Sequence, residues 1–142
     1  MRFRLHLLPM APRVDPVSSD DKLPPSVDVV IIGGGIVGTS AALYLAKRGV
    51  AVALCEKGHI GGEQSSRNWG WCRKMQRDPR EIPLAIEALR LWGEMNQEVE
   101  AETGFRVCGI AYFFDDREAM DKNAAWLEQA RLYQLDSRML NA

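Results

Sequence analysis

The stretch VDVVIIGGGIVGTSAALYLAKRGVAVALCEK, at residues 27–57, decides the fold of this chain. Its first six residues are apolar except for one aspartate and do not alternate, which is typical of a parallel strand covered on both faces. Three glycines then follow in the spacing G-x-G-x-x-G, at Gly33, Gly35 and Gly38. In that pattern the first glycine makes a tight turn, the second lets the backbone approach a pyrophosphate, and the third lets a helix lie close to the strand. The spacing predicts a cradle for a dinucleotide.

The helix expected after the glycines has charges that suit an anionic ligand. Residues 36–40 contain no carboxylate, so the positive end of the helix dipole is free for a phosphate. Lys47 and Arg48 occupy the last turn, and Gly49 is a suitable left-handed cap. These signals predict a helix of about three turns.

A second apolar strand at residues 50–55 completes a strand, helix and strand unit. Glu56 stands at its end, where a carboxylate can accept hydrogen bonds from a ribose 2′-hydroxyl. One alternative is a tight turn without a ligand. Another is the glycine loop of a kinase, but that loop joins two strands, whereas residues 39–48 have a helical composition. The unit therefore predicts a nucleotide site without saying which nucleotide.

Composition bounds the function further. The 142 residues are 46% hydrophobic, enough for one ordinary domain, and the formal net charge of −1 favours neither nucleic acid nor an acidic membrane as a partner. Cys55, Cys72 and Cys108 form no C-x-x-C pair and are odd in number, which indicates a reducing cytosol. No run approaches the ~20 apolar residues of a membrane span. We expect a cytoplasmic protein without a metal site.

Residues 1–26 differ from the rest of the chain. They hold five of the seven prolines and show little periodicity, so we expect a disordered tail. Arg2, Arg4 and the apolar residues 5–10 resemble an export signal, but the apolar run is short and Pro9 interrupts it. An exported protein and an extended or mis-assigned start remain alternatives.

A polar, glycine-rich loop with two tryptophans, GHIGGEQSSRNWGWCRK, follows at residues 58–74. Its hydroxyls can donate to phosphate oxygens, its arginine can neutralise them, and its asparagine can meet both edges of a heterocycle. A glycine would let the backbone approach a flat ring. The residues concerned are Ser65, Ser66, Arg67, Asn68 and Gly70. The alternative is a solvated connection that uses serine and asparagine for turns.

The glycine cradle with its acid, followed shortly by SSRNWG, resembles the glycine and D-amino-acid oxidase or dehydrogenase family of FAD-dependent oxidoreductases. The resemblance covers residues 27–74 well and the rest loosely. It implies that the cradle and its acid hold the ADP half of FAD, while SSRNWG lies along the pyrophosphate and flavin. The expected cofactor-binding residues are Gly33, Gly34, Gly35, Ile36, Val37, Gly38, Glu56, Lys57, Ser65, Ser66, Arg67, Asn68 and Gly70.

The resemblance also implies a reaction, in which an amine, a D-amino acid or a glycine-type substrate is oxidised by hydride transfer to the flavin. No residue can be named as the general base. An NAD-dependent dehydrogenase is an alternative, although SSRNWG so soon after Glu56 favours FAD. A non-catalytic, truncated FAD-binding fragment is another. His59 is expected to be a loop residue, and Cys72 a small core residue.

The second half predicts a long amphipathic helix. Asp78 is a plausible N-cap with Pro79 and Glu81 at the first and third positions, and the helix should end near Gly104. Its broad apolar face comprises Ile82, Leu84, Ala85, Ile86, Leu89, Trp92, Met95 and Val99.

Two further segments follow this helix. Residues 105–114, FRVCGIAYFF, are β-rich with Gly109 as a kink or bulge, and residues 117–135 return to a helical pattern. Trp92 and Trp126 are expected in the core rather than at a ligand.

The predicted fold class is α/β: a Rossmann-like, FAD-binding βαβ unit with parallel strands, then a helix and the start of an α+β substrate domain. The expected divisions are the tail at residues 1–26, the FAD-binding portion at 27–104, and a truncated start of the substrate domain at 105–142. Two such apolar strands need sheet neighbours and helices on both faces, so the fold is expected to be incomplete. We expect a missing C-terminal part or a partner chain to close the site, and this chain alone to bind FAD weakly without turnover.

Overall fold

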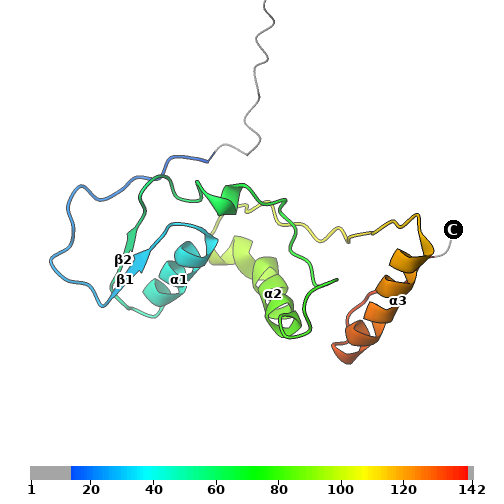
Figure 1. Cartoon of the computed structure of the whole chain (residues 1–142). Coiled ribbons are helices and arrows are strands. Elements are labelled where there is room, and N and C mark those ends of the chain that lie inside the picture. Colours follow the sequence, from blue (N-terminus) through cyan, green and yellow to red (C-terminus); the bar gives the residue numbers. More distant parts are fainter. Residues whose placement is uncertain (1–13, 141–142) are drawn as a thin grey trace, which may run out of the picture. The chain divides into compact units, whose positions relative to one another are not determined.

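The computed structural model describes residues 14–140 (Figure 1). Part of the predicted tail, residues 1–13, lies outside these residues, and residues 14–26 contain no helix or strand. The chain divides into two compact units, Met1–Gly70 and Trp71–Ala142, which are described separately. No helix within residues 14–140 is long and apolar enough to cross a membrane.

The first unit is a parallel βαβ arrangement. Strand β1 spans Val29–Ile32, helix α1 spans Ile36–Lys47, and strand β2 spans Val52–Cys55. The two strands pair in parallel, with Val29 opposite Val52 and Ile32 opposite Cys55. After α1 the chain turns at Gly49, whose φ of +78° is the left-handed conformation expected of a helix cap. The predicted parallel unit and its α/β class are confirmed.

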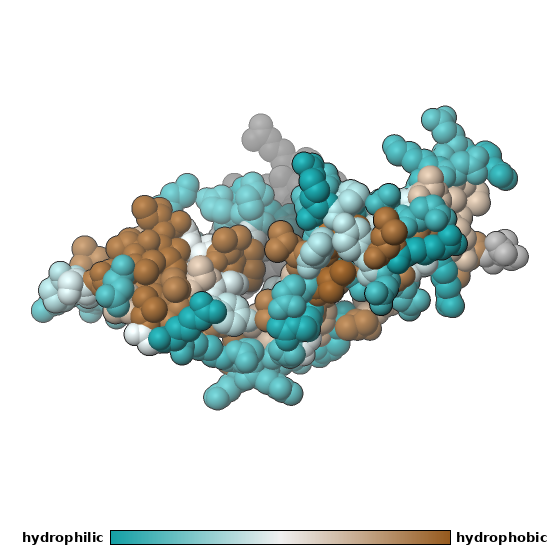
Figure 2. Space-filling model, turned by 90° about the horizontal axis from the view of Figure 1, so that it is seen from below, coloured by the Kyte–Doolittle hydropathy of each residue, from teal (hydrophilic) through white to brown (hydrophobic). Residues whose placement is uncertain are grey.

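Burial alternates along β1 because successive side chains point to opposite faces of the sheet. Val29 and Ile31 are half-buried, and Ile31 lies beside Gly38 of α1. Ile32 points to the other face and is 90% exposed. Hydrophobic side chains accordingly gather over the βαβ unit in Figure 2, whereas hydrophilic ones dominate over α3, Arg117–Leu132. The composition of the strands predicts that both faces of the sheet are covered by other elements. Within residues 14–140 only one face is covered.

In the second unit, helix α2 spans Ile82–Glu98 and begins later than the sequence predicts. The carboxylate of Asp78 accepts hydrogen bonds from the backbone and guanidinium N–H groups of Arg80, so it does not cap a helix. Pro83, in the first turn of α2, has no N–H to bond the carbonyl four residues earlier, which prevents the helix from extending toward Pro79. Asp78 as N-cap and Pro79 as the first helical residue are therefore wrong.

The end and the buried face of α2 also differ from the prediction. The helix ends at Glu98 rather than near Gly104, because Glu100 takes a left-handed φ of +52°. Ile82 is fully buried, whereas Leu84 is 74% exposed. The half-buried apolar positions follow at Ala85, Leu89, Leu91, Trp92 and Met95. The apolar face therefore excludes Leu84, Ile86 and Val99, which are exposed, and includes Leu91, which was not predicted.

Residues 105–114 form no strand in the described structure, which corrects the β prediction. A strand needs a neighbour to pair with, and none of the described segments pairs with this one. Val107 and Phe113 are about nine-tenths exposed, while the rings of Tyr112 and Phe114 stack 6.4 Å apart. Gly109 has a φ of +74°, so the expected kink is present.

Helix α3 begins where the sequence predicts and ends three residues before position 135. The carboxylate of Asp116 caps it by accepting from the N–H of Ala119 at 2.7 Å. The indole N–H of Trp126 donates to the carbonyl of Arg77 at 3.5 Å, and the ring of Trp92 on α2 stacks on Phe105 at 6.0 Å. Both tryptophans are half-buried, as expected of packing residues.

Candidate functional site

The glycine turn connects β1 to α1 and is held by three hydrogen bonds, two to backbone groups and one to a side chain. The N–H of Gly33 donates to the carbonyl of Cys55 at 2.8 Å, and Gly33 itself has a φ of +107°. Gly34 is buried, and its N–H donates to the Glu56 carboxylate at 2.7 Å. Its carbonyl accepts from the N–H of Gly61 at 2.8 Å. The turn is therefore fixed by the end of β2 and by the loop that follows it.

The third glycine of the motif is required by close packing. A Cβ at Gly38 would overlap the carbonyl oxygen of Gly33 and lie 3.3 Å from Cγ2 of Ile31. A backbone carbonyl cannot rotate away as the end of a side chain can. The absence of a side chain at Gly38 is what lets α1 lie against β1, as the sequence pattern predicts.

The N-terminus of α1 is prepared for an anion. Its N-cap, Gly35, offers no side-chain acceptor, and its first turn contains no acidic residue. The first N–H groups of a helix have no partner within the helix. One of them, from Ile36, donates at 2.8 Å to the hydroxyl oxygen of Ser65, which lies 29 residues later in the chain. Because the hydroxyl accepts this bond, its own proton remains available to a phosphate oxygen.

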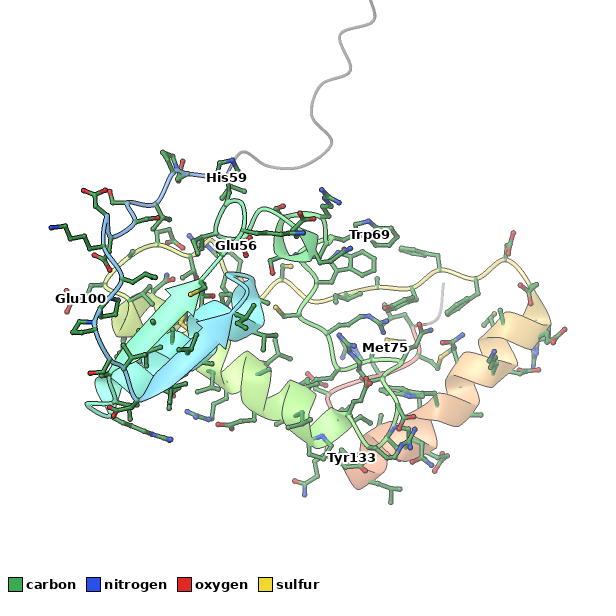
Figure 3. The ribbon with its side chains drawn as sticks, turned by 60° about the vertical axis from the view of Figure 1, so that its left-hand side comes forward. Glu56, His59, Trp69, Met75, Glu100 and Tyr133 are labelled. Atoms are coloured by element: carbon green, nitrogen blue, oxygen red, sulfur yellow. The ribbon has the colours of Figure 1, made fainter. Side chains whose placement is uncertain are left out.

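Glu56 follows β2 and lies beside the glycine turn (Figure 3). One of its oxygens accepts from Gly34 and the other accepts from the N–H of Gly58 at 2.8 Å. These two backbone N–H groups hold the pKa of the Glu56 carboxyl below its usual value, and that of Gly34 has the larger effect. Each oxygen accepts one of these bonds and so keeps a second lone pair. Because the side chain is partly exposed, a ribose hydroxyl can reach these lone pairs.

The loop of SSRNWG forms a single 3₁₀ turn, η1, at Gln64–Ser66. Asn68 braces this loop with both ends of its amide: Nδ2 donates to the carbonyl of Ser65, and Oδ1 accepts from Gly70 at 2.6 Å. Gly70 has a φ of +70°, a conformation that favours glycine. These two hydrogen bonds of Asn68 stabilise the loop conformation in which Ser65 lies at the glycine turn.

The other expected site residues lie on the loop that follows β2, except for Val37, which lies on α1. Ser66 donates through its hydroxyl to the carbonyl of Glu63, while Arg67 and Lys57 form exposed ion pairs with the Glu63 carboxylate at 3.5 and 4.0 Å. Val37 is exposed on the first turn of α1. His59 is exposed on the loop after Glu56, as expected. Cys72 is exposed too, so it is not the small core residue that was expected.

Sequence reasoning missed three residues that shape the site. Gly61 donates to Gly34, the side chain of Ile60 occupies the space where Gly34 would carry a Cβ, and Glu63 organises two cations and a hydroxyl. The two glycines at positions 61 and 62 were the available signal for a close approach of the loop.

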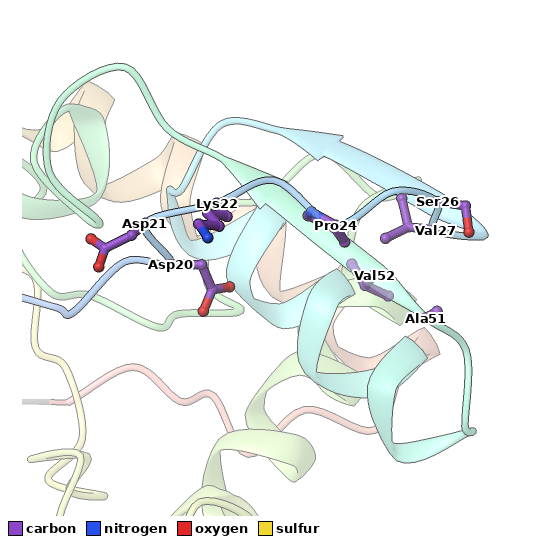
Figure 4. Close-up of a pocket in the computed structure, with 8 residues that line it drawn as sticks. All are labelled: Asp20, Asp21, Lys22, Pro24, Ser26, Val27, Ala51 and Val52. Atoms are coloured by element: carbon purple, nitrogen blue, oxygen red, sulfur yellow. The ribbon is translucent and has the colours of Figure 1, made fainter.

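A surface hollow lies along the strands and reaches their amino ends (Figure 4). It is lined by Asp20, Asp21, Lys22, Pro24, Ser26, Val27, Ala51 and Val52. Ligands of parallel α/β sheets bind beyond the carboxyl ends of the strands, where the glycine turn lies. The lining of the hollow includes neither the glycine turn nor Glu56 nor SSRNWG, so the hollow is not part of the cradle.

The fold and the cradle define a dinucleotide-binding βαβ protein. A turn without side chains, a helix N-terminus without acids and an ionised carboxylate at the end of β2 fit an adenosine diphosphate group. The chain belongs to the family described as FAD dependent oxidoreductase (DAO), which matches residues 28–142. Membership confirms the family resemblance, and it identifies FAD rather than NAD as the family's cofactor.

Several of the similar proteins are oxidases and deaminases of amines and amino acids. Sarcosine oxidase subunit beta of Rhizobium meliloti is 30% identical over 118 residues, which cover 82% of this chain and 28% of the relative. A glycine oxidase of Geobacillus kaustophilus is 32% identical over 83 residues, which cover 56% and 22% respectively. The structure of L-amino acid deaminase from Proteus myxofaciens in complex with anthranilate aligns with a TM-score of 0.77 at 36% identity, over 92% of this chain and 29% of that one. The chain thus spans less than a third of the length of each of these proteins.

Proposed function

We propose that this chain supplies the ADP-binding half of the FAD site of an oxidoreductase acting on an amine or an amino acid. The hydrogen bond from Ile36 to the Ser65 hydroxyl carries the proposal. It joins the two sequence features that resemble the family, the glycine cradle and SSRNWG, at the helix N-terminus.

Each group has a defined task in this proposal. The N–H groups of the first turn of α1 and the Ser65 hydroxyl would hold the pyrophosphate by donating to its oxygens. Glu56 accepts from the ribose, and Arg67 supplies a positive charge near the phosphates. Further along SSRNWG, Asn68 and Gly70 would hold the flavin end of FAD, and bound FAD would supply the hydride acceptor for oxidation of the substrate.

The remaining members of the proposed cofactor site are the residues that line the glycine turn, the exposed cation that follows Glu56, and a second serine hydroxyl of the loop. They are Gly33, Gly34, Gly35, Val37, Gly38, Lys57 and Ser66. The substrate class rests on the names of the similar proteins, which act on sarcosine, glycine and L-amino acids. A cytoplasmic location is supported by three cysteines that are free and exposed.

We also propose that residues 27–104 act as the FAD-binding portion, that residues 105–142 begin the substrate domain, and that further polypeptide closes the site. The open face of β1, where Ile32 is 90% exposed, supports the last point because a parallel strand of this composition is normally covered on both faces. The chain without that cover is expected to bind FAD weakly and to turn over no substrate.

Titration of the 142-residue chain with ADP tests the proposal, because ADP contains the groups assigned to the cradle and lacks the flavin. Ser65→Ala should weaken ADP binding about tenfold, since one hydrogen bond to a charged phosphate is lost. Ser26→Ala is the matched control, because this exposed serine lies at the amino end of β1, away from the glycine turn, and the substitution should change the affinity less than twofold.

Equal effects of the two substitutions would contradict the placement of the pyrophosphate, and a chain that binds no ADP would contradict the function itself. The flavin absorbance of the purified, complete oxidoreductase checks the choice of FAD over NAD independently, because bound flavin absorbs visible light.

A further inference from the structure

Glu56 joins two segments that lie on either side of it. One carboxylate oxygen accepts from Gly34 in the turn after β1, at 2.7 Å and 22 residues away. The other accepts from Gly58 in the loop after β2, at 2.8 Å. A ribose-binding acid needs neither contact, so the arrangement points to an additional task.

The bond to Gly34 controls the orientation of the peptide between Gly33 and Gly34. All peptide bonds of residues 14–140 are trans, so the N–H of Gly34 and the carbonyl of Gly33 point in opposite directions. With the N–H held by Glu56, the carbonyl is directed at Gly38 of α1, where it occupies the place of a missing Cβ. Glu56 thereby locks the peptide against which the helix is seated.

The next peptide is held in the same way. The carbonyl of Gly34 accepts from Gly61, so the N–H of Gly35 points to the opposite side of the peptide plane. Gly34 is buried, and a Cβ there would lie 3.2 and 3.3 Å from Cβ and Cγ of Glu56. The side chain of Glu56 therefore packs beside Gly34 and also accepts from the Gly34 N–H, which belongs to the preceding peptide.

We propose that Glu56 is a positioning residue for the pyrophosphate site: it holds the glycine turn in the conformation that presents the Gly35 amide and the α1 N-terminus to an anion. This inference rests on the proposed function and adds to it, because it gives Glu56 an effect on phosphate binding that does not pass through the ribose. Only a carboxylate serves both amides, since glutamine has a single acceptor oxygen and would turn an NH₂ group on the second donor.

Inorganic pyrophosphate separates the two roles because it has no ribose. If Glu56 only contacts ribose, Glu56→Gln should leave pyrophosphate affinity unchanged or increase it, because a negative charge near the anion is removed. If Glu56 positions the turn, the affinity should fall about tenfold despite that gain. Asp28→Asn is the control, since it deletes an exposed carboxylate at the amino end of β1, where an asparagine oxygen can still accept from the N–H of Ala51, and it should not weaken binding.

Amide hydrogen exchange of the ligand-free chain, followed by NMR, gives a second and independent measurement. In Glu56→Gln the amide of Gly34 or of Gly58 should exchange at least tenfold faster, whereas both should be unchanged in Asp28→Asn. Unchanged exchange at both amides in Glu56→Gln would refute the positioning role whether or not any ligand binds. Faster exchange in a chain that binds neither ADP nor pyrophosphate would keep the positioning role and refute the proposed function. Pyrophosphate binding that is undiminished in Glu56→Gln would refute the positioning role while leaving the ADP site intact.

Discussion

Replacing Gly38 by alanine has two effects on stability that act in opposite directions, and the size of each is known. Alanine in place of glycine within a helix is favourable by about 1 kcal/mol. The new Cβ, however, overlaps the carbonyl oxygen of Gly33 and lies 3.1 Å from its carbon. Relieving such an overlap typically costs about 1–3 kcal/mol, and the upper end applies because the obstacle is backbone in a locked turn. We expect a net loss of about 2 kcal/mol in the stability of the first unit.

Gly93 of α2 offers the matched control. It too lies inside a helix, and a Cβ there would meet nothing within 4 Å. Gly93→Ala should therefore stabilise α2 by about 1 kcal/mol, so that the same substitution has opposite signs at the two positions.

The two units contain different helices, so the assay should report on the stability of each helix by itself. Hydrogen exchange of the amides of α1 and α2 at increasing urea concentrations gives the free energy of unfolding of each. A Gly38→Ala chain whose α1 is as stable as in the parent, or more stable, would refute the close packing described here. A loss of similar size at Gly93 would show that the substitution acts through something other than that overlap.

Three more predictions follow from burial and charge. Ile82→Ala should destabilise the second unit by about 2–5 kcal/mol because the side chain is fully buried, whereas Leu84→Ala should cost less than about 0.5 kcal/mol in the same urea titration. The pKa of Glu56 is lowered by its backbone donors, so its contribution to stability is complete above its usual value of 4.5 and is lost as the pH falls through the lower value of the folded chain; NMR titration of the carboxyl should show its midpoint below 4.5. Lysine at both Val107 and Phe113 should raise the solubility of the chain, measured by sedimentation, because these apolar side chains are about nine-tenths exposed on an unpaired β-prone segment; equal solubility would argue that this segment does not associate.

Local sequence patterns were sufficient for the elements of the first unit. The apolar runs, the glycine spacing and the cap at Gly49 place β1, α1 and β2 within two residues of their observed limits, since each signal acts on its immediate neighbours. The same reasoning failed at Asp78, where a salt bridge to Arg80 competes with helix capping. It also failed at residues 105–114, because β propensity does not supply the partner that a strand requires.

The candidate site, too, was only partly predictable from the sequence. Its residue types and their order were predictable, including Glu56 and Ser65. The partners of those residues were not, because the bond from Ile36 to Ser65 and the bond from Gly34 to Glu56 join positions 29 and 22 residues apart. Such side chain to backbone contacts depend on the path of the loop, which no periodicity describes.

The short sequence span of the cradle has a consequence for how it is made. Its backbone and side-chain contacts all close loops of fewer than thirty residues, and each doubling of loop length adds only about 0.6 kcal/mol of closure entropy. Contacts of low sequence separation form early in folding, and domains assemble from the N-terminal side during synthesis. A ribosome that has released the chain through Gly70 has therefore exposed every group of the cradle, so its assembly can begin before residues 71–142 have left the exit tunnel.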